Sequence, residues 1–143
     1  MKYLYKIIVY ISLMFAVLPI NQAFAYITDE NNMGLARQVI ATNPSMKNHF
    51  MNMGVEEFGA CAATSIAMSA WEVRGDITLN QDNQLMWAVI TVGAGLARQN
   101  LMSQGYPDEM LGNTLKYKGA LLQNASTQTS VMAECTNFMA SFN

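Results

Sequence analysis

Three side chains near residue 50 combine residue types and a spacing that suit a soft metal ion. Met46, His49 and Met53 are separated by three and four positions, so on a single helix all three would share one face. Thioether sulfurs and an imidazole nitrogen suit Cu(I), and the pattern therefore admits a copper site. The alternative is ordinary packing, because methionine adapts to irregular core spaces and the 12 methionines are spread along the chain.

The two cysteines, Cys61 and Cys135, are the second pair of residues with a chemistry of their own. In an oxidising compartment an even pair predicts a disulfide. Such a bond would remove about 4–5 kcal/mol of unfolded-chain entropy in the simple polymer description. It requires the two Cα atoms to approach within about 7 Å. Two separate buried thiols are the alternative.

Catalytic sets are hard to assemble from the remaining residues. His49 is the only histidine, which limits zinc sites with several imidazoles and histidine relays. The acidic pairs Asp29-Glu30, Glu56-Glu57 and Asp108-Glu109 stand where helix starts are expected, and the helix dipole accounts for them. Gly93-Ala94-Gly95 lies inside an apolar stretch and not between a strand and a helix, so it is no phosphate loop. We therefore predict no catalytic residues and no cofactor; an enzyme would need carboxylates that converge only in the folded chain.

Aromatic side chains offer a different route to function. Trp71, Tyr106 and Tyr117 stand near charged residues or helix ends and could line a surface for a partner protein, since aromatic residues are enriched at protein interfaces. Ordinary packing is the competing interpretation for each of them. Trp87 lies in an apolar run and is expected in the core.

Residues 1–25 have the pattern of a cleaved secretory signal. Lys2 and Lys6 precede an apolar run over residues 7–18, and Ala23-Phe24-Ala25 offers the small-x-small pattern that a signal peptidase accepts. The mature chain is then a single domain over 26–143, in the bacterial periplasm or outside the cell. The apolar run is too short for a comfortable membrane span, with an uncleaved anchor as the alternative.

The charge balance narrows the class of partner. Residues 1–25 hold two of the eight basic residues and none of the ten acidic ones, so the mature chain has a formal net charge of −4. No basic cluster remains to neutralise phosphates, which disfavours a nucleic-acid partner. The scattered charge likewise disfavours an anionic membrane surface.

Capping residues and glycines divide the mature chain into helices. We expect a compact all-α bundle of about four main helices plus one or two short ones, with one disulfide. Gly75 should end the helix that begins at about Val55, as a left-handed C-cap, and Gly105 should end the helix that begins at Asn80. The expected helix starts are Thr28 with the acidic pair after it, Asn43-Pro44, Val55, Asn80, Tyr106-Pro107, and Ser126 or Thr127.

Small residues are dense over 59–70 and again over 93–97. Because small side chains let helix backbones approach closely, we predict that these two helices cross there. Residues 85–97 are apolar except for Thr91, which predicts a fully buried central helix.

Short stretches around the cysteines carry one family resemblance. Gly59-Ala60-Cys61-Ala62-Ala63 in an early long helix and Met132-Ala133-Glu134-Cys135-Thr136-Asn137-Phe138 in the last one resemble the small periplasmic immunity proteins of type VI secretion amidase effectors. The resemblance covers these stretches and the general layout. It implies a helical periplasmic protein that neutralises an enzyme, and it carries over no contact residues.

Taken together, these patterns favour an exported, non-catalytic helical domain that binds a protein in the periplasm, for example as an inhibitor or immunity protein. The partner is an unidentified protein, with a second copy of the chain as another option. The alternative is a periplasmic copper-binding protein that uses Met46, His49 and Met53.

Overall fold

A computed structural model describes residues 25–142 as helices joined by short loops. Four long helices, α4 to α7, and two shorter ones, α2 and α3, confirm the expected all-α fold. The predicted signal at residues 1–25 lies, except for Ala25, outside the described residues. The helices are α2 (Glu30–Ala41), α3 (Pro44–Met51), α4 (Val55–Val73), α5 (Gln81–Ser103), α6 (Asp108–Leu122) and α7 (Ala125–Ala140).

Asparagine side chains cap the N-termini of three of these helices. Asn43 and Asn80 each accept a hydrogen bond from the backbone N–H three residues later, at 3.2 and 2.9 Å, as predicted. Asn124 accepts a hydrogen bond from the backbone N–H of Ser126, two residues later, at 3.0 Å, so α7 begins before the predicted caps Ser126 and Thr127. That prediction was wrong because an asparagine immediately upstream already satisfies the first turn.

The helix ends follow the glycines. Gly75 follows α4 with φ +81°, and Gly105 follows α5 with φ +103°. Both angles lie in the left-handed region that residues with a Cβ rarely adopt. The chain therefore turns sharply at each of these positions, which lets α5 run back along α4 and α6 return over α4.

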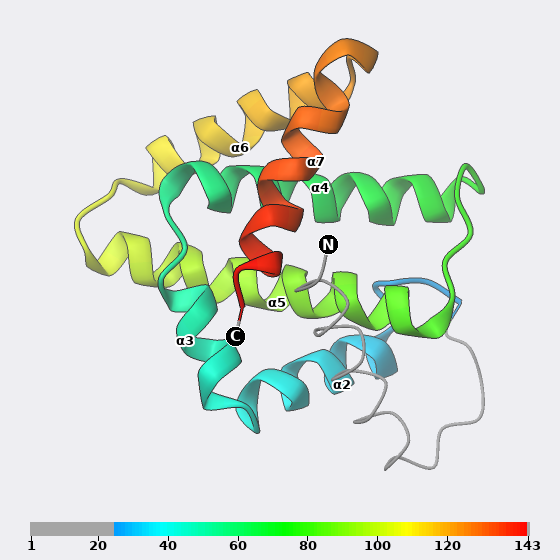
Figure 1. Cartoon of the computed structure of the whole chain (residues 1–143), viewed down its shortest axis with the longest axis horizontal. Coiled ribbons are helices and arrows are strands. Elements are labelled where there is room, and N and C mark those ends of the chain that lie inside the picture. Colours follow the sequence, from blue (N-terminus) through cyan, green and yellow to red (C-terminus); the bar gives the residue numbers. More distant parts are fainter. Residues whose placement is uncertain (1–24, 143) are drawn as a thin grey trace.

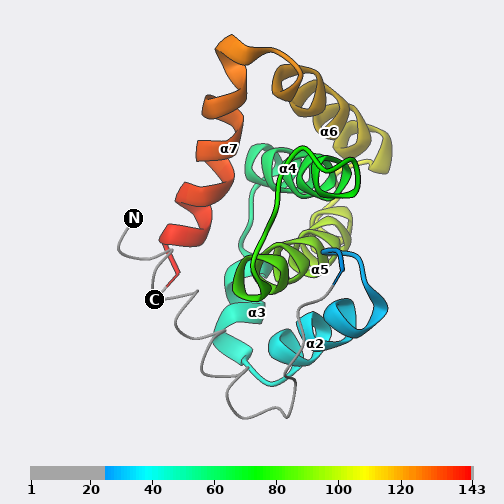
Figure 2. The same ribbon diagram turned by 90° about the vertical axis from the view of Figure 1, so that its right-hand side faces the viewer.

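The long helices stack in successive layers. Figures 1 and 2 show α4 between α6 on one side and α5 on the other, with α2 beyond α5. α7 runs steeply across the side of α4 and α6, and α3 connects α2 to the start of α4. Helix α4 thus contacts α5, α6 and α7 at once.

The core is centred on α5 and α4. Trp87 is buried, as expected, together with Leu85 and Ile90 of the same helix. The expectation of a fully buried central helix holds for 84–90 but not beyond, because Gly95 is exposed and Thr91 only half-buried. Within residues 25–142, no helix combines the length and the apolar character that crossing a membrane requires.

Two glycines of the small-residue stretches allow a close approach between helices, but not between the predicted pair, α4 and α5. A Cβ at Gly59 of α4 would lie 2.6 Å from Cγ2 of Thr114, so this glycine lets α6 approach. A Cβ at Gly93 of α5 would overlap the ring of Phe50 on α3. Gly95 has nothing within 4 Å of such an atom. α4 and α5 do contact each other, but the glycines mark the α4–α6 and α3–α5 contacts.

The predicted disulfide is present. Cys61 on α4 and Cys135 on α7 are bonded, with their Cα atoms 4.7 Å apart and both side chains fully buried. The bond closes a separation of 74 residues and fixes the last helix to the middle layer. Such a bond is compatible with the predicted export.

A buried polar network holds the start of the described chain. Ile27 is fully buried, and its backbone N–H donates to Oε1 of Glu72 at 2.5 Å. Nε2 of Gln84 donates to the other oxygen of that carboxylate at 2.9 Å. Nδ2 of Asn32 donates to the carbonyl oxygens of Ile27 and Gln84, at 2.7 and 3.1 Å. The loop before α2 is therefore tied to α4 and α5.

Candidate functional site

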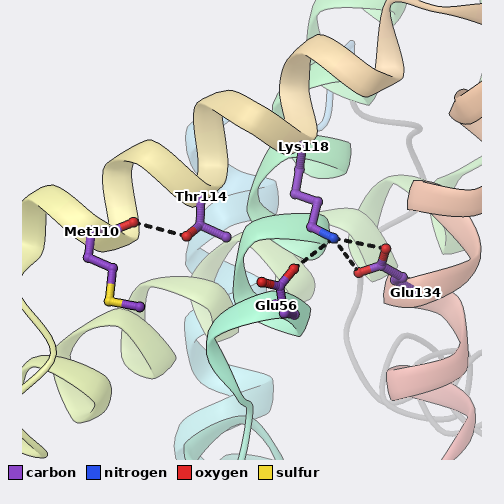
Figure 3. A network of polar contacts seen from close by, with 5 residues as sticks. All are labelled: Glu56, Met110, Thr114, Lys118 and Glu134. Atoms are coloured by element: carbon purple, nitrogen blue, oxygen red, sulfur yellow. Dashed lines mark hydrogen bonds and ion pairs between the residues drawn. The ribbon is translucent and has the colours of Figure 1, made fainter.

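Helix α6 is fixed to its neighbours by one buried lysine. Nζ of Lys118 lies 2.9 Å from Oε2 of Glu56 on α4 and 2.9 Å from both carboxylate oxygens of Glu134 on α7. Figure 3 shows the lysine reaching from α6 between the two glutamates. Its side chain is 7% exposed, against 35% for Glu134 and 72% for Glu56. Three helices therefore meet at one cation, which we call the Lys118 node (Lys118, Glu56 and Glu134).

The node keeps its lysine protonated. Burial lowers the pKa of Lys118, but the hydrogen bonds and charges of Glu134 and Glu56 act in the opposite direction and raise it above its ordinary value of 10.5. Lys118 is thus a fixed cation at neutral pH. It is neutralised within the node and is not presented to solvent.

An open groove lies on the solvent side of this node, along α6. It has a volume of about 480 Å³ and is walled mainly by α6 and the loop before it. The side chains of Tyr117 and Met110 border it and are 62% and 44% exposed. We call it the α6 groove; its lining residues are Glu56, Pro107, Glu109, Met110, Asn113, Thr114 and Tyr117.

The floor of the α6 groove is closely packed. Thr114 lies over Gly59 of α4, and a residue larger than glycine at position 59 would clash with it. The Thr114 hydroxyl donates to the carbonyl oxygen of Met110 at 3.0 Å (Figure 3). The start of α6 is fixed separately, because Asp108 pairs with Arg98 of α5 at 2.5 Å. The groove is consequently built on a rigid helix.

The three predicted partner residues fall on different parts of the molecule. Tyr117 lines the α6 groove, and Tyr106, 38% exposed, directly precedes Pro107 at its end. Trp71 does not join them: it is half-buried against the core and lines a second, smaller groove of about 180 Å³ on the other side of α6. Tyr117 and Trp71 therefore line different grooves, and Tyr106 is placed near the α6 groove only by its position before Pro107.

The predicted copper ligands do not share one helix face. α3 ends at Met51, so Met53 lies in the loop after it, and the helical spacing on which the prediction rested does not apply. Met46 and Met53 are 1% and 2% exposed. Nε2 of His49 donates a hydrogen bond to the carbonyl oxygen of Phe138 at 2.7 Å, and its ring stacks on the Phe138 ring with centroids 4.1 Å apart. Each of these side chains has a packing role, and the copper alternative is left to titration.

The two residues of the acidic pair Glu56-Glu57 have different roles. Glu57 accepts the backbone N–H of Gly54 at 3.0 Å and caps α4, at a position where a helix start was predicted. Its neighbour Glu56 instead belongs to the Lys118 node, which the sequence did not indicate. Within residues 25–142, no three or more histidine, cysteine, aspartate or glutamate side chains are grouped as metal ligands would be.

The comparisons with known proteins add no further constraint. No protein-family model, no curated protein and no solved structure matches this chain.

Proposed function

We propose that this chain is an exported, non-catalytic helical domain that binds another protein through the α6 groove, as an inhibitor or immunity protein of a periplasmic enzyme does. The observation that carries the proposal is the exposure of Tyr117 and Met110 around an open groove. Tyrosine and methionine are enriched at protein interfaces and depleted from surfaces without a partner. A loop of the partner protein would contact these two large side chains at the α6 groove.

The rigidity of the groove supports this role. The Lys118 node joins α6 to α4 and α7, and the buried disulfide joins α7 to α4. Binding to a surface that is already ordered avoids the cost of immobilising it, which improves affinity for a given contact area. A small domain fixed in this way suits recognition better than a mobile one.

Two observations of different kind support the proposed compartment. The sequence pattern of residues 1–25 predicts export, and the disulfide is of the kind that forms in oxidising compartments such as the periplasm. We therefore look for the partner among periplasmic proteins.

Site-specific photocrosslinking in the native periplasm tests the proposal. A photoreactive phenylalanine analogue replaces Tyr117 in one variant and Arg37 in another; Arg37 is exposed on α2, at the far side of the layered fold (Figure 2). We expect a discrete crosslinked protein with the probe at position 117 and not with the probe at 37. The Tyr117→Ala protein, added in excess without a probe, should compete less well than the unmodified protein.

Equal crosslinking from both positions, or none from position 117 in cells grown under several conditions, would contradict a protein-binding role for the α6 groove. Circular dichroism of each variant confirms that the helical fold is retained.

A further inference from the structure

We infer that the α6 groove recognises a basic side chain, an arginine or lysine carried on an exposed segment of the partner protein. The inference rests on the proposed protein-binding function and specifies the chemistry of its partner. Three features of the groove support it: its charge, its aromatic wall and the fixed position of its carboxylate.

The charge of the groove is negative and is not balanced from within. The Lys118 node contains one cation and two carboxylates, so it has one excess negative charge. Glu109, on the exposed wall of the groove, adds a second. A basic side chain at this point would neutralise charge that the fold leaves in excess, which favours encounter and orientation.

An anionic segment is disfavoured for the same reason. Lys118, which pairs with the lining residue Glu56, is 7% exposed at its side chain and already bound to two carboxylates. An incoming carboxylate or phosphate would meet Glu56 and Glu109 before it could reach that lysine. The groove thus favours a cationic over an anionic side chain, in addition to the selection that its shape imposes.

The apolar wall matches the rest of a basic side chain. The Tyr117 ring and the Met110 thioether are exposed beside Pro107 and can cover the aliphatic part of an arginine or lysine. A guanidinium group can also lie over the tyrosine face, where the ring quadrupole attracts a cation. A single arginine or lysine side chain of the partner can therefore make both the charged contact and the apolar contact.

Glu56 is held in place for this contact. Its Oε2 atom bonds to Lys118, while the side chain as a whole remains 72% exposed at the edge of the groove. A long side chain that is fixed at one oxygen loses less freedom when the other oxygen takes a partner. The buried lysine is thus a positioning residue for an exposed acceptor.

The test uses the mature protein and short synthetic peptides as probes. Acetyl-Ala-Leu-Arg-Leu-Ala-amide is compared with the same peptide containing citrulline, which has the shape of arginine without its charge, and with one containing glutamate. Binding is followed by amide chemical shifts in two-dimensional NMR spectra. We expect the arginine peptide to shift the amides of Glu109, Asn113 and Tyr117 saturably, and to bind at least about fivefold more tightly than the citrulline peptide.

Matched variants locate the charge effect. Glu109→Gln and Glu56→Gln should each weaken binding of the arginine peptide by about two- to fivefold. Glu30→Gln, the same change at an exposed position on α2, should leave it unaltered. Added salt should weaken the arginine peptide and leave the citrulline peptide nearly unchanged.

Two outcomes overturn the inference: equal binding of the arginine and citrulline peptides, or no shifts in the α6 groove with any peptide. Crosslinking from position 117 separates this failure from failure of the proposed function. If a specific partner still crosslinks there while the charge discrimination is absent, protein binding stands and the basic partner class falls.

Discussion

Replacing Lys118 by methionine tests whether this side chain fixes α6 to the rest of the fold. Methionine keeps most of the aliphatic stem and removes the ammonium group, so the packing beside Gly59 is largely preserved. What is lost is the pair of contacts to Glu56 and Glu134, both at 2.9 Å. The two carboxylates are then left near each other without their shared cation.

The expected cost lies between two limits. Removing one partner of a fully buried ion pair costs about 3–5 kcal/mol, because a buried charge is left alone. An exposed pair contributes about 0.2–1 kcal/mol. Here the lysine is 7% exposed but Glu134 and Glu56 are 35% and 72% exposed and can rehydrate. We therefore expect Lys118→Met to lower the free energy of unfolding by about 1–3 kcal/mol.

Urea unfolding, followed by far-UV circular dichroism, measures this difference, and Lys116→Met is the matched control. Lys116 is exposed on the same helix, two residues away, and its replacement should change stability by no more than about 0.5 kcal/mol. The double variant Lys118→Met with Glu134→Gln should recover part of the loss, because it relieves the repulsion between the two carboxylates.

The pH dependence has a defined sign. The folded state raises the pKa of Lys118 above 10.5, so its contribution is fully present below 10.5 and is lost as the pH rises through the folded-state value. The stability difference between the unmodified protein and Lys118→Met should be constant from about pH 7 to 9.5 and should shrink at higher pH. If Lys118→Met and Lys116→Met are equally stable, the lysine does not fix α6 and the reasoning for a rigid groove fails.

Three further predictions concern the core, the disulfide and the copper alternative. Gly93→Ala should lower the unfolding free energy by about 1–3 kcal/mol in urea titrations, because its Cβ overlaps Phe50, whereas Gly95→Ala should raise it by about 0.5–1 kcal/mol; equal effects would contradict the packing described. Reducing the Cys61–Cys135 bond should cost about 4 kcal/mol, measured as the shift between unfolding curves with and without dithiothreitol, and an unchanged curve would argue against a structural role. Cu(I) titration of the folded protein should show no tight site, since Met46 and Met53 are buried; tight binding that His49→Ala with Met53→Ala abolishes would instead establish the copper alternative.

The local signals in the sequence predicted the helices well because they act over a few residues. Asn43 and Asn80 cap the helices that follow them, and Gly75 and Gly105 take the left-handed conformations that end α4 and α5. The error at Ser126 arose within the same class of signal, since Asn124 is an equally good cap and comes first. Local sequence signals predict a helix start to within a few residues. Which of two neighbouring cap residues is used depends on the fold.

Long-range relations were predictable only where covalent chemistry limited the choices. Two cysteines allow a single pairing, so Cys61 and Cys135 could be joined from the sequence. Lys118 offered no such limit: its partners lie 62 residues before it and 16 residues after it, and nothing local distinguishes it from Lys116. Tyr117, which lines the α6 groove, was singled out from the sequence, whereas the charged edge of the groove depends on the packing of three helices.

The anchoring of Ile27 places a constraint on the order of events during maturation. The predicted cleavage point after Ala25 is two residues from this fully buried side chain, and the backbone N–H groups of Ala25 and Tyr26 already donate to the Asp29 carboxylate, at 2.7 and 3.3 Å. A peptidase needs an extended, accessible strand around the bond that it cuts, so removal of a leader would have to precede docking of Ile27 against Glu72. Cleavage there would also turn the Tyr26 amide into an ammonium group beside Asp29, and thereby exchange its amide–carboxylate hydrogen bond for an ion pair. The Ala25 contact at 2.7 Å would be lost in the same step, so the new terminus would hold Asp29 by its charge where the uncut chain holds it with two backbone amides.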